Sequence, residues 1–155
     1  MKTKLPAPYT GSTPEIELHY KRPVFDSMFS IREAKDACKI LRKTVHPKRW
    51  DLKEMFFVIL LTNSNSVLGI AELGSGTTEA VKVNIKEIFQ LALVSNASAL
   101  IICHNHPSGK MVISPSDKAI TKNIQELANQ MGFTLLDHII ITSEDYISFA
   151  EEHLL

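Results

Sequence analysis

The feature that most constrains this chain is an apolar run at residues 97–103 that leads directly into two histidines. The run is short and almost wholly apolar, which indicates a buried β-strand. If the strand continues through His104 and His106, their imidazoles share one face, roughly 7 Å apart, because alternate residues of a strand point the same way. Pro107 and Gly109 then end the strand and begin a loop. The sequence therefore predicts two imidazoles side by side at the end of a core strand.

A carboxylate is expected to return to this point from the helix that follows. Ser114 and Pro115 suit the N-cap and the first position of a helix, so Asp117 lies in its first turn. Two imidazoles and one carboxylate form a three-ligand metal site that leaves one position for water, as in catalytic zinc sites. The alternative is that Ser114 and Asp117 only form a capping box, but this alternative does not explain the two histidines upstream.

The segment of residues 104–121 resembles the motif of a known family. It begins with H-N-H-P-S-G, continues with S-P-S-D from Ser114, and ends with I-T. This resembles the H-x-H-P-x6-S-x-x-D motif of JAB/JAMM (MPN-type) metalloproteases, in the form found in the bacterial RadC-like branch. Ile113 departs from that form, which usually has proline before the serine; the change alters loop stiffness but removes no ligand. The resemblance extends over about residues 32–149 and implies the deaminase-like JAB/MPN fold.

The resemblance also implies a zinc-dependent hydrolase of the JAMM type that cleaves a peptide or isopeptide amide with metal-activated water. The zinc ligands of the family match His104, His106 and Asp117 in this sequence. Its general base, a glutamate at the start of an earlier strand, matches Glu54, although an ordinary carboxylate at a strand end would look the same. Its serine, which helps to bind the oxyanion of the tetrahedral intermediate, matches Ser114, for which helix capping is an equal alternative.

Other polar residues around the motif have structural interpretations. Asn105 lies between the two histidines and is expected to face the opposite side of the strand. Asp137 and His138 lie on a later apolar strand, where they match a D-H-I-I segment of the family while their neighbours indicate the core. His138 is therefore either a core residue or a hydrogen-bond partner of a metal-binding histidine, and it is not among the predicted ligands.

Hydrophobic periodicity predicts an α/β arrangement. Apolar residues at spacings of three and four, after a capping box that begins at Ser30, predict a helix over residues 31–45. The other expected elements are strands at residues 15–21, 54–61, 67–73, 78–83, 97–106, 133–142 and 146–149, and helices at 85–96, after a cap at Asn84, and 115–131. Hairpins and helices interleave along the chain, which predicts a mixed β-sheet flanked by helices.

Length and composition indicate a single domain. A chain of 155 residues can bury about 70% of its unfolded surface, and we expect a flexible lead-in over residues 1–14 and one domain over residues 15–155. No apolar run is long enough for a membrane helix, and the N-terminus lacks the apolar core of a signal peptide, which predicts a cytoplasmic protein without a membrane partner. Cys38 and Cys103 are expected to be small core residues.

The alternative function is a non-enzymatic, DNA-associated accessory module, because RadC-like proteins carry a DNA-repair label. The formal net charge is zero, yet residues 1–53 carry 12 Lys/Arg against 6 Asp/Glu, and residues 54–155 carry 5 against 11. A basic docking face and an ordinary solvated helix both fit this asymmetry, the second more simply. A peptide or protein substrate is therefore favoured over nucleic acid, and nothing in the pattern specifies an oligomeric state.

Two further functional classes have less support in the sequence. The base-deaminase signature H-x-E…P-C-x-x-C is absent from the sequence, which disfavours deamination. A third alternative is a metal-binding scaffold that contacts a partner through the strand expected at residues 15–21.

Overall fold

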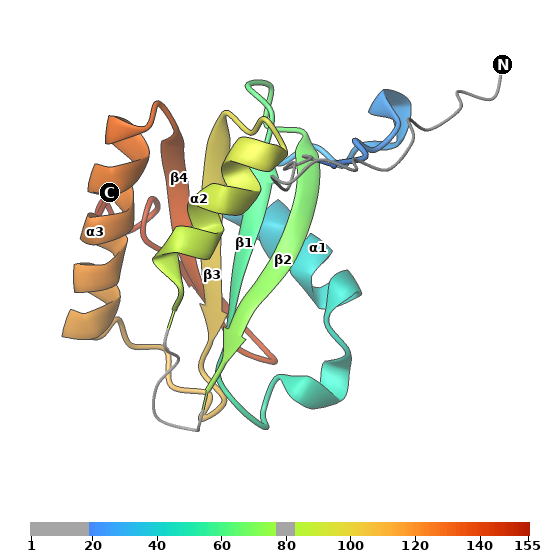
Figure 1. Ribbon diagram of the computed structural model, residues 1–155. Coiled ribbons are helices and arrows are strands. Elements are labelled where there is room, and N and C mark those ends of the chain that lie inside the picture. Colours follow the sequence, from blue (N-terminus) through green and yellow to red (C-terminus); the bar gives the residue numbers. More distant parts are fainter. Residues whose placement is uncertain (1–18, 77–82) are drawn as a thin grey trace, which may run out of the picture.

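The chain folds around a mixed β-sheet (Figure 1). The computed structural model describes residues 19–76 and 83–155. In these ranges the strands are β1 (Met55–Leu61), β2 (Val67–Ser75), β3 (Ala99–Asn105), β4 (Thr134–Ile141) and β5 (Tyr146–Ser148). They form one sheet in the order β2-β1-β3-β4-β5. The β3–β4 pair is parallel, and the other three pairs are antiparallel.

Helices cover both faces of this sheet. The α-helices of the described ranges are α1 (Ala34–Thr44), α2 (Ile85–Val94) and α3 (Pro115–Gln130), and two short 3₁₀ turns are η1 (Phe25–Ser27) and η2 (Pro47–Arg49). α1 packs on one face, and α2 and α3 pack on the other (Figure 1). The predicted fold class, a mixed sheet flanked by helices, is confirmed.

Alternation along the central strands divides the interior into two cores. Phe57 and Cys103 face α1, whereas Phe56 and Ile102 face α2 and α3. All seven residues of β1 are buried, because this strand lies inside the sheet with helices on both faces. His104 continues the face of Ile102, so its imidazole lies on the side of the sheet that α3 covers.

One helix begins later than the sequence predicts. α1 starts at Ala34, because Ser30 forms a β-bridge with Ser66 and makes no helix cap. Asp36, in the first turn, accepts a backbone hydrogen bond at the helix start instead. The predicted inner stripe of this helix is nevertheless buried throughout: Ile31, Ala34, Cys38, Leu41 and Val45.

Several predictions at the N-terminal side and around residue 80 fall outside the described residues. These are the lead-in at residues 1–14 and most of the strands expected at 15–21 and 78–83. Residues 19–21, which are described, have no regular secondary structure, so the prediction of a strand is wrong for these three residues. The helix expected at 85–96 ends at Val94. In the described ranges, no helix combines the length and the apolar character needed to cross a bilayer.

Candidate metal centre

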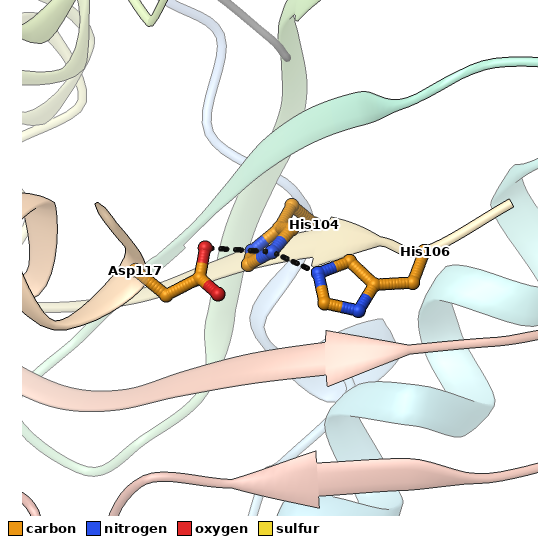
Figure 2. A group of neighbouring side chains, drawn as sticks. All are labelled: His104, His106 and Asp117. Carbon is orange, nitrogen blue, oxygen red and sulfur yellow. Dashed lines mark hydrogen bonds and ion pairs between the residues drawn. The ribbon is translucent and has the colours of Figure 1, made fainter. Parts of the chain in front are cut away.

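The structure brings the two motif histidines and the motif aspartate together (Figure 2). His104 lies near the end of β3, His106 directly follows that strand, and Asp117 lies in the first turn of α3. The Nε2 atom of His104 is 3.0 Å from Nε2 of His106 and 3.2 Å from Oδ1 of Asp117. One ligand atom from each residue lies within 4.8 Å of the other two, so the group can hold a metal ion.

The orientation of His106 is set by a backbone carbonyl. Its Nδ1 atom lies 2.8 Å from the carbonyl oxygen of Lys110. A carbonyl oxygen accepts hydrogen bonds and donates none, so Nδ1 of His106 carries the proton. The lone pair of a neutral His106 is then on Nε2, which faces His104.

The capping box at the start of α3 orients Asp117. Ser114 Oγ accepts a hydrogen bond from the Asp117 amide (3.1 Å), and Asp117 Oδ2 accepts one from the Ser114 amide (2.7 Å). The helix cap therefore uses one carboxylate oxygen and leaves Oδ1 facing His104. Burial opposes the ionisation of Asp117, but the contacts with His104 and Ser114 outweigh it and hold the pKa of this carboxyl well below its ordinary value.

The donor set at this point could hold a metal ion. The two imidazole nitrogens and the carboxylate oxygen lie close enough for one metal ion to contact all three. A proton can join one pair of these atoms, whereas a metal cation can be bound by all three at once. The capping interpretation of Ser114 and Asp117 is confirmed, and the use of two different carboxylate oxygens makes it compatible with metal binding.

Glu54 directly precedes β1 and lines the same pocket as the three predicted ligands and Ser114. This pocket is open and has a volume of about 580 Å³. Burial raises the pKa of the Glu54 carboxyl, the two histidines oppose this effect, and the Asp117 carboxylate adds to it. Glu54 thus shares a pocket with the predicted ligands, and its role as the general base stays a prediction.

Asn105 faces away from the pocket, as predicted, and its amide binds the segment that carries Glu54. Its Oδ1 atom accepts a hydrogen bond from the Met55 amide (2.6 Å). Its Nδ2 atom donates to the carbonyl oxygens of Trp50 (2.7 Å) and Lys53 (3.0 Å). The side chain is completely buried, and the groups that it binds lie on both sides of Glu54. Asn105 therefore fixes the backbone from which Glu54 enters the pocket.

We expect Asn105→Ala to lower the free energy of unfolding by about 3 kcal/mol, because it removes three hydrogen bonds between a buried side chain and the backbone, two of them to the buried Met55 amide and Trp50 carbonyl. Urea unfolding of the purified protein measures the loss. Asn84→Ala is the matched control: this asparagine is exposed and makes no side-chain cap at α2, so the expected change is below about 0.5 kcal/mol. Equal stabilities of the two variants would contradict this role of Asn105.

His138 reaches the site, although the sequence did not place it among the ligands. It is completely buried on β4, and its Nε2 atom lies 2.8 Å from Nδ1 of His104. Burial lowers the pKa of His138 well below its ordinary value, and the neighbouring His104 adds to this effect. Asp137 points to the opposite face, where it accepts hydrogen bonds from the Ser148 hydroxyl and the Ala150 amide. Of these two residues, His138 contacts the predicted metal site and Asp137 does not.

Comparison with known proteins decides the family. The sequence model of the RadC-like JAB domain matches residues 31–154. The chain belongs to the RadC-like JAB domain family. The resemblance at residues 104–121 is thereby confirmed over most of the chain.

Curated relatives of this RadC-like JAB domain are bacterial proteins named UPF0758. One from Flavobacterium johnsoniae is 38% identical over 122 residues, which cover 79% of this chain and 52% of that protein. Relatives from Actinobacillus succinogenes and Histophilus somni are 43% and 41% identical over 103 and 100 residues, which cover 66% and 64% of this chain and 47% and 45% of those proteins. The chain thus spans about half the length of the curated relatives that it matches.

Proposed function

We propose that this RadC-like JAB domain is a zinc-dependent hydrolase of the JAMM type that cleaves a peptide or isopeptide amide with activated water. The observation that carries this proposal is the convergence of three electron-pair donors beside the half-buried carboxyl of Glu54 in one open pocket. Three protein ligands with one open position are typical of catalytic zinc, whereas structural zinc takes four protein ligands.

The residues around the pocket supply the remaining chemistry. Zinc bound by His104, His106 and Asp117 supplies a Lewis acid and lowers the pKa of water toward about 7. Glu54 accepts the proton of the attacking water and returns it to the leaving nitrogen, a role that its raised pKa suits. Ser114 Oγ is an acceptor in the capping box, so its own hydroxyl proton stays available for the oxyanion of the tetrahedral intermediate.

Zinc-dependent cleavage is the direct test of this function. Purified protein loaded with zinc is incubated with a peptide library, and the products are analysed by mass spectrometry. We expect cleavage that a chelator abolishes and that added zinc restores. Zinc-independent DNA binding that weakens with salt, without any cleavage, would support the DNA-associated alternative instead.

The raised pKa of Glu54 has a consequence for stability. We expect Glu54→Gln to stabilise the metal-free protein against urea at neutral pH. Burial raises the pKa of this carboxyl above its value in the unfolded chain, so its ionisation costs folding free energy once the pH exceeds both values. The gain should shrink as the pH falls and Glu54 becomes protonated in both states. A variant less stable than the wild type at neutral pH would contradict the burial of a charged Glu54.

A further inference from the structure

A chain of buried hydrogen bonds runs from the backbone of α3 to His104. Thr121 Oγ lies 2.5 Å from the Asp117 carbonyl oxygen and 2.6 Å from Nδ1 of His138. His138 Nε2 in turn lies 2.8 Å from Nδ1 of His104. All three side chains in this chain, Thr121, His138 and His104, are buried. The last of these hydrogen bonds therefore reaches His104 at Nδ1, whereas Nε2, on the other side of the ring, faces the predicted metal position.

The Asp117 carbonyl, at the start of the series, determines the direction of each hydrogen bond. The Asp117 carbonyl only accepts, and two oxygens 2.5 Å apart need a hydrogen between them, so the Thr121 hydroxyl proton points at this carbonyl. Thr121 Oγ has no second proton and must accept from His138, which places a proton on Nδ1 of His138. A neutral His138 then presents a lone pair on Nε2.

The surroundings of His138 favour the neutral ring. Its imidazole stacks on Phe149 with ring centroids 4.6 Å apart and lies 6.2 Å from the ring of Phe56. Its two nitrogens bond to Thr121 and His104, and neither bond is to a carboxylate. A charged imidazolium in this apolar position would be buried without an anion in contact, which is costly.

We propose that Thr121 and His138 are positioning residues that fix the tautomer of His104, with the proton on Nδ1 and the lone pair on Nε2. His138 Nε2 accepts the Nδ1 proton of His104, so in a neutral His104 the other nitrogen carries no proton and faces His106 and Asp117. The Lys110 carbonyl does the same for His106 through a single bond. Both predicted histidine ligands thus present Nε2 lone pairs before a metal arrives.

This series of hydrogen bonds from Asp117 through Thr121 and His138 to His104, here called the relay, also couples two of the predicted ligands. It starts at the backbone carbonyl of Asp117, whose side chain is one ligand, and it ends at His104, which is another. A change at Thr121 therefore acts on His104 without touching the ligand atoms themselves.

Nitrogen NMR of the histidine rings tests the tautomers in the wild-type, metal-free protein. At a pH where the histidines are neutral, we expect the ring proton of both His104 and His138 on Nδ1. Protonation of either ring on Nε2 would overturn the proposal. This inference rests on the proposed function for its purpose, but the tautomer is measured without zinc. If the protein cleaves peptides with zinc but NMR shows His104 protonated on Nε2, the relay is refuted and the function is not. If NMR shows the expected tautomers but the protein binds no zinc, the function is refuted and the relay is not.

Zinc affinity, measured by competition with a chromogenic chelator, gives the second readout. We expect Thr121→Val to weaken zinc binding by roughly 10- to 100-fold, because the His138 Nδ1 proton loses its acceptor. Thr121→Ser keeps the hydroxyl and should stay close to the wild type. Thr44→Val is the matched control, since Thr44 also donates to the carbonyl four residues earlier but lies on α1, and its zinc affinity should not change. Equal affinities of the Thr121→Val and wild-type proteins would overturn the proposal.

Discussion

Replacing Glu54 with glutamine is expected to lower amide-cleaving turnover by roughly 10²- to 10⁴-fold while zinc remains bound. Glutamine has nearly the same shape and keeps the loop that Asn105 holds, but it cannot take a proton from water. Because Glu54 is not part of the group that can bind the metal, zinc affinity should change little. Turnover of the best peptide from the library and zinc content, measured on the same preparation, separate the two effects.

The control for this variant is Glu126→Gln, which neutralises an exposed carboxylate on α3 and should retain full activity. Full turnover of zinc-loaded Glu54→Gln would remove Glu54 from the mechanism. Loss of zinc together with activity would instead mean that Glu54 binds the metal.

Replacing Asp117 with asparagine is expected to reduce zinc affinity by more than the 10- to 100-fold that loss of an outer hydrogen-bond partner costs. In the wild type, Oδ2 of the carboxylate accepts the Ser114 amide in the helix cap, and Oδ1, the predicted ligand atom, faces His104. Asparagine has a single acceptor oxygen. If that oxygen accepts the Ser114 amide in the helix cap, the NH₂ group of the asparagine side chain faces His104. The variant should therefore fold with α3 intact and bind zinc poorly.

Asp36→Asn is the matched control for Asp117→Asn. Asp36 is also in the first turn of a helix and accepts a backbone amide, but it lies on α1. Chelator competition and circular dichroism should show that both variants are folded and that only Asp117→Asn has lost affinity. Unchanged zinc affinity in Asp117→Asn would mean that this residue serves the helix cap alone.

The central part of the site could be predicted from local sequence alone. The alternation of a strand places His104 and His106 together, and the cap at Ser114 places Asp117 in the first turn of α3. Both rules act over a few residues, so they need no knowledge of the tertiary fold. The structure shows both local geometries, with the correction that His106 lies just beyond the end of β3.

The residues that support the site could not be predicted in this way, because their contacts depend on the order of the strands. Glu54 comes close to the histidines because β1 pairs with β3, and only the family resemblance pointed to it. His138 reaches His104 because β4 lies parallel to β3 with His138 opposite Ile102. The Asn105 amide meets the loop before β1 through the same pairing of β1 with β3. A single sequence does not specify such pairings.

At the start of α1, a local sequence rule gives a wrong prediction because a tertiary contact overrides it. Ser30 and the glutamate three residues later have the form of a capping box, but Ser30 is held in a β-bridge with Ser66. The tertiary pairing of the segment before α1 with the β1–β2 hairpin prevails over a local preference that is worth about 1 kcal/mol.

Metal analysis of the purified protein tests the central claim most directly. Wild-type protein and the His104→Ala variant are exposed to zinc, freed of unbound metal and measured by atomic emission, with circular dichroism to establish that both are folded. The account predicts stoichiometric zinc in the wild type and its loss in His104→Ala. A folded wild-type protein without zinc, or a variant that retains as much zinc as the wild type, would contradict it.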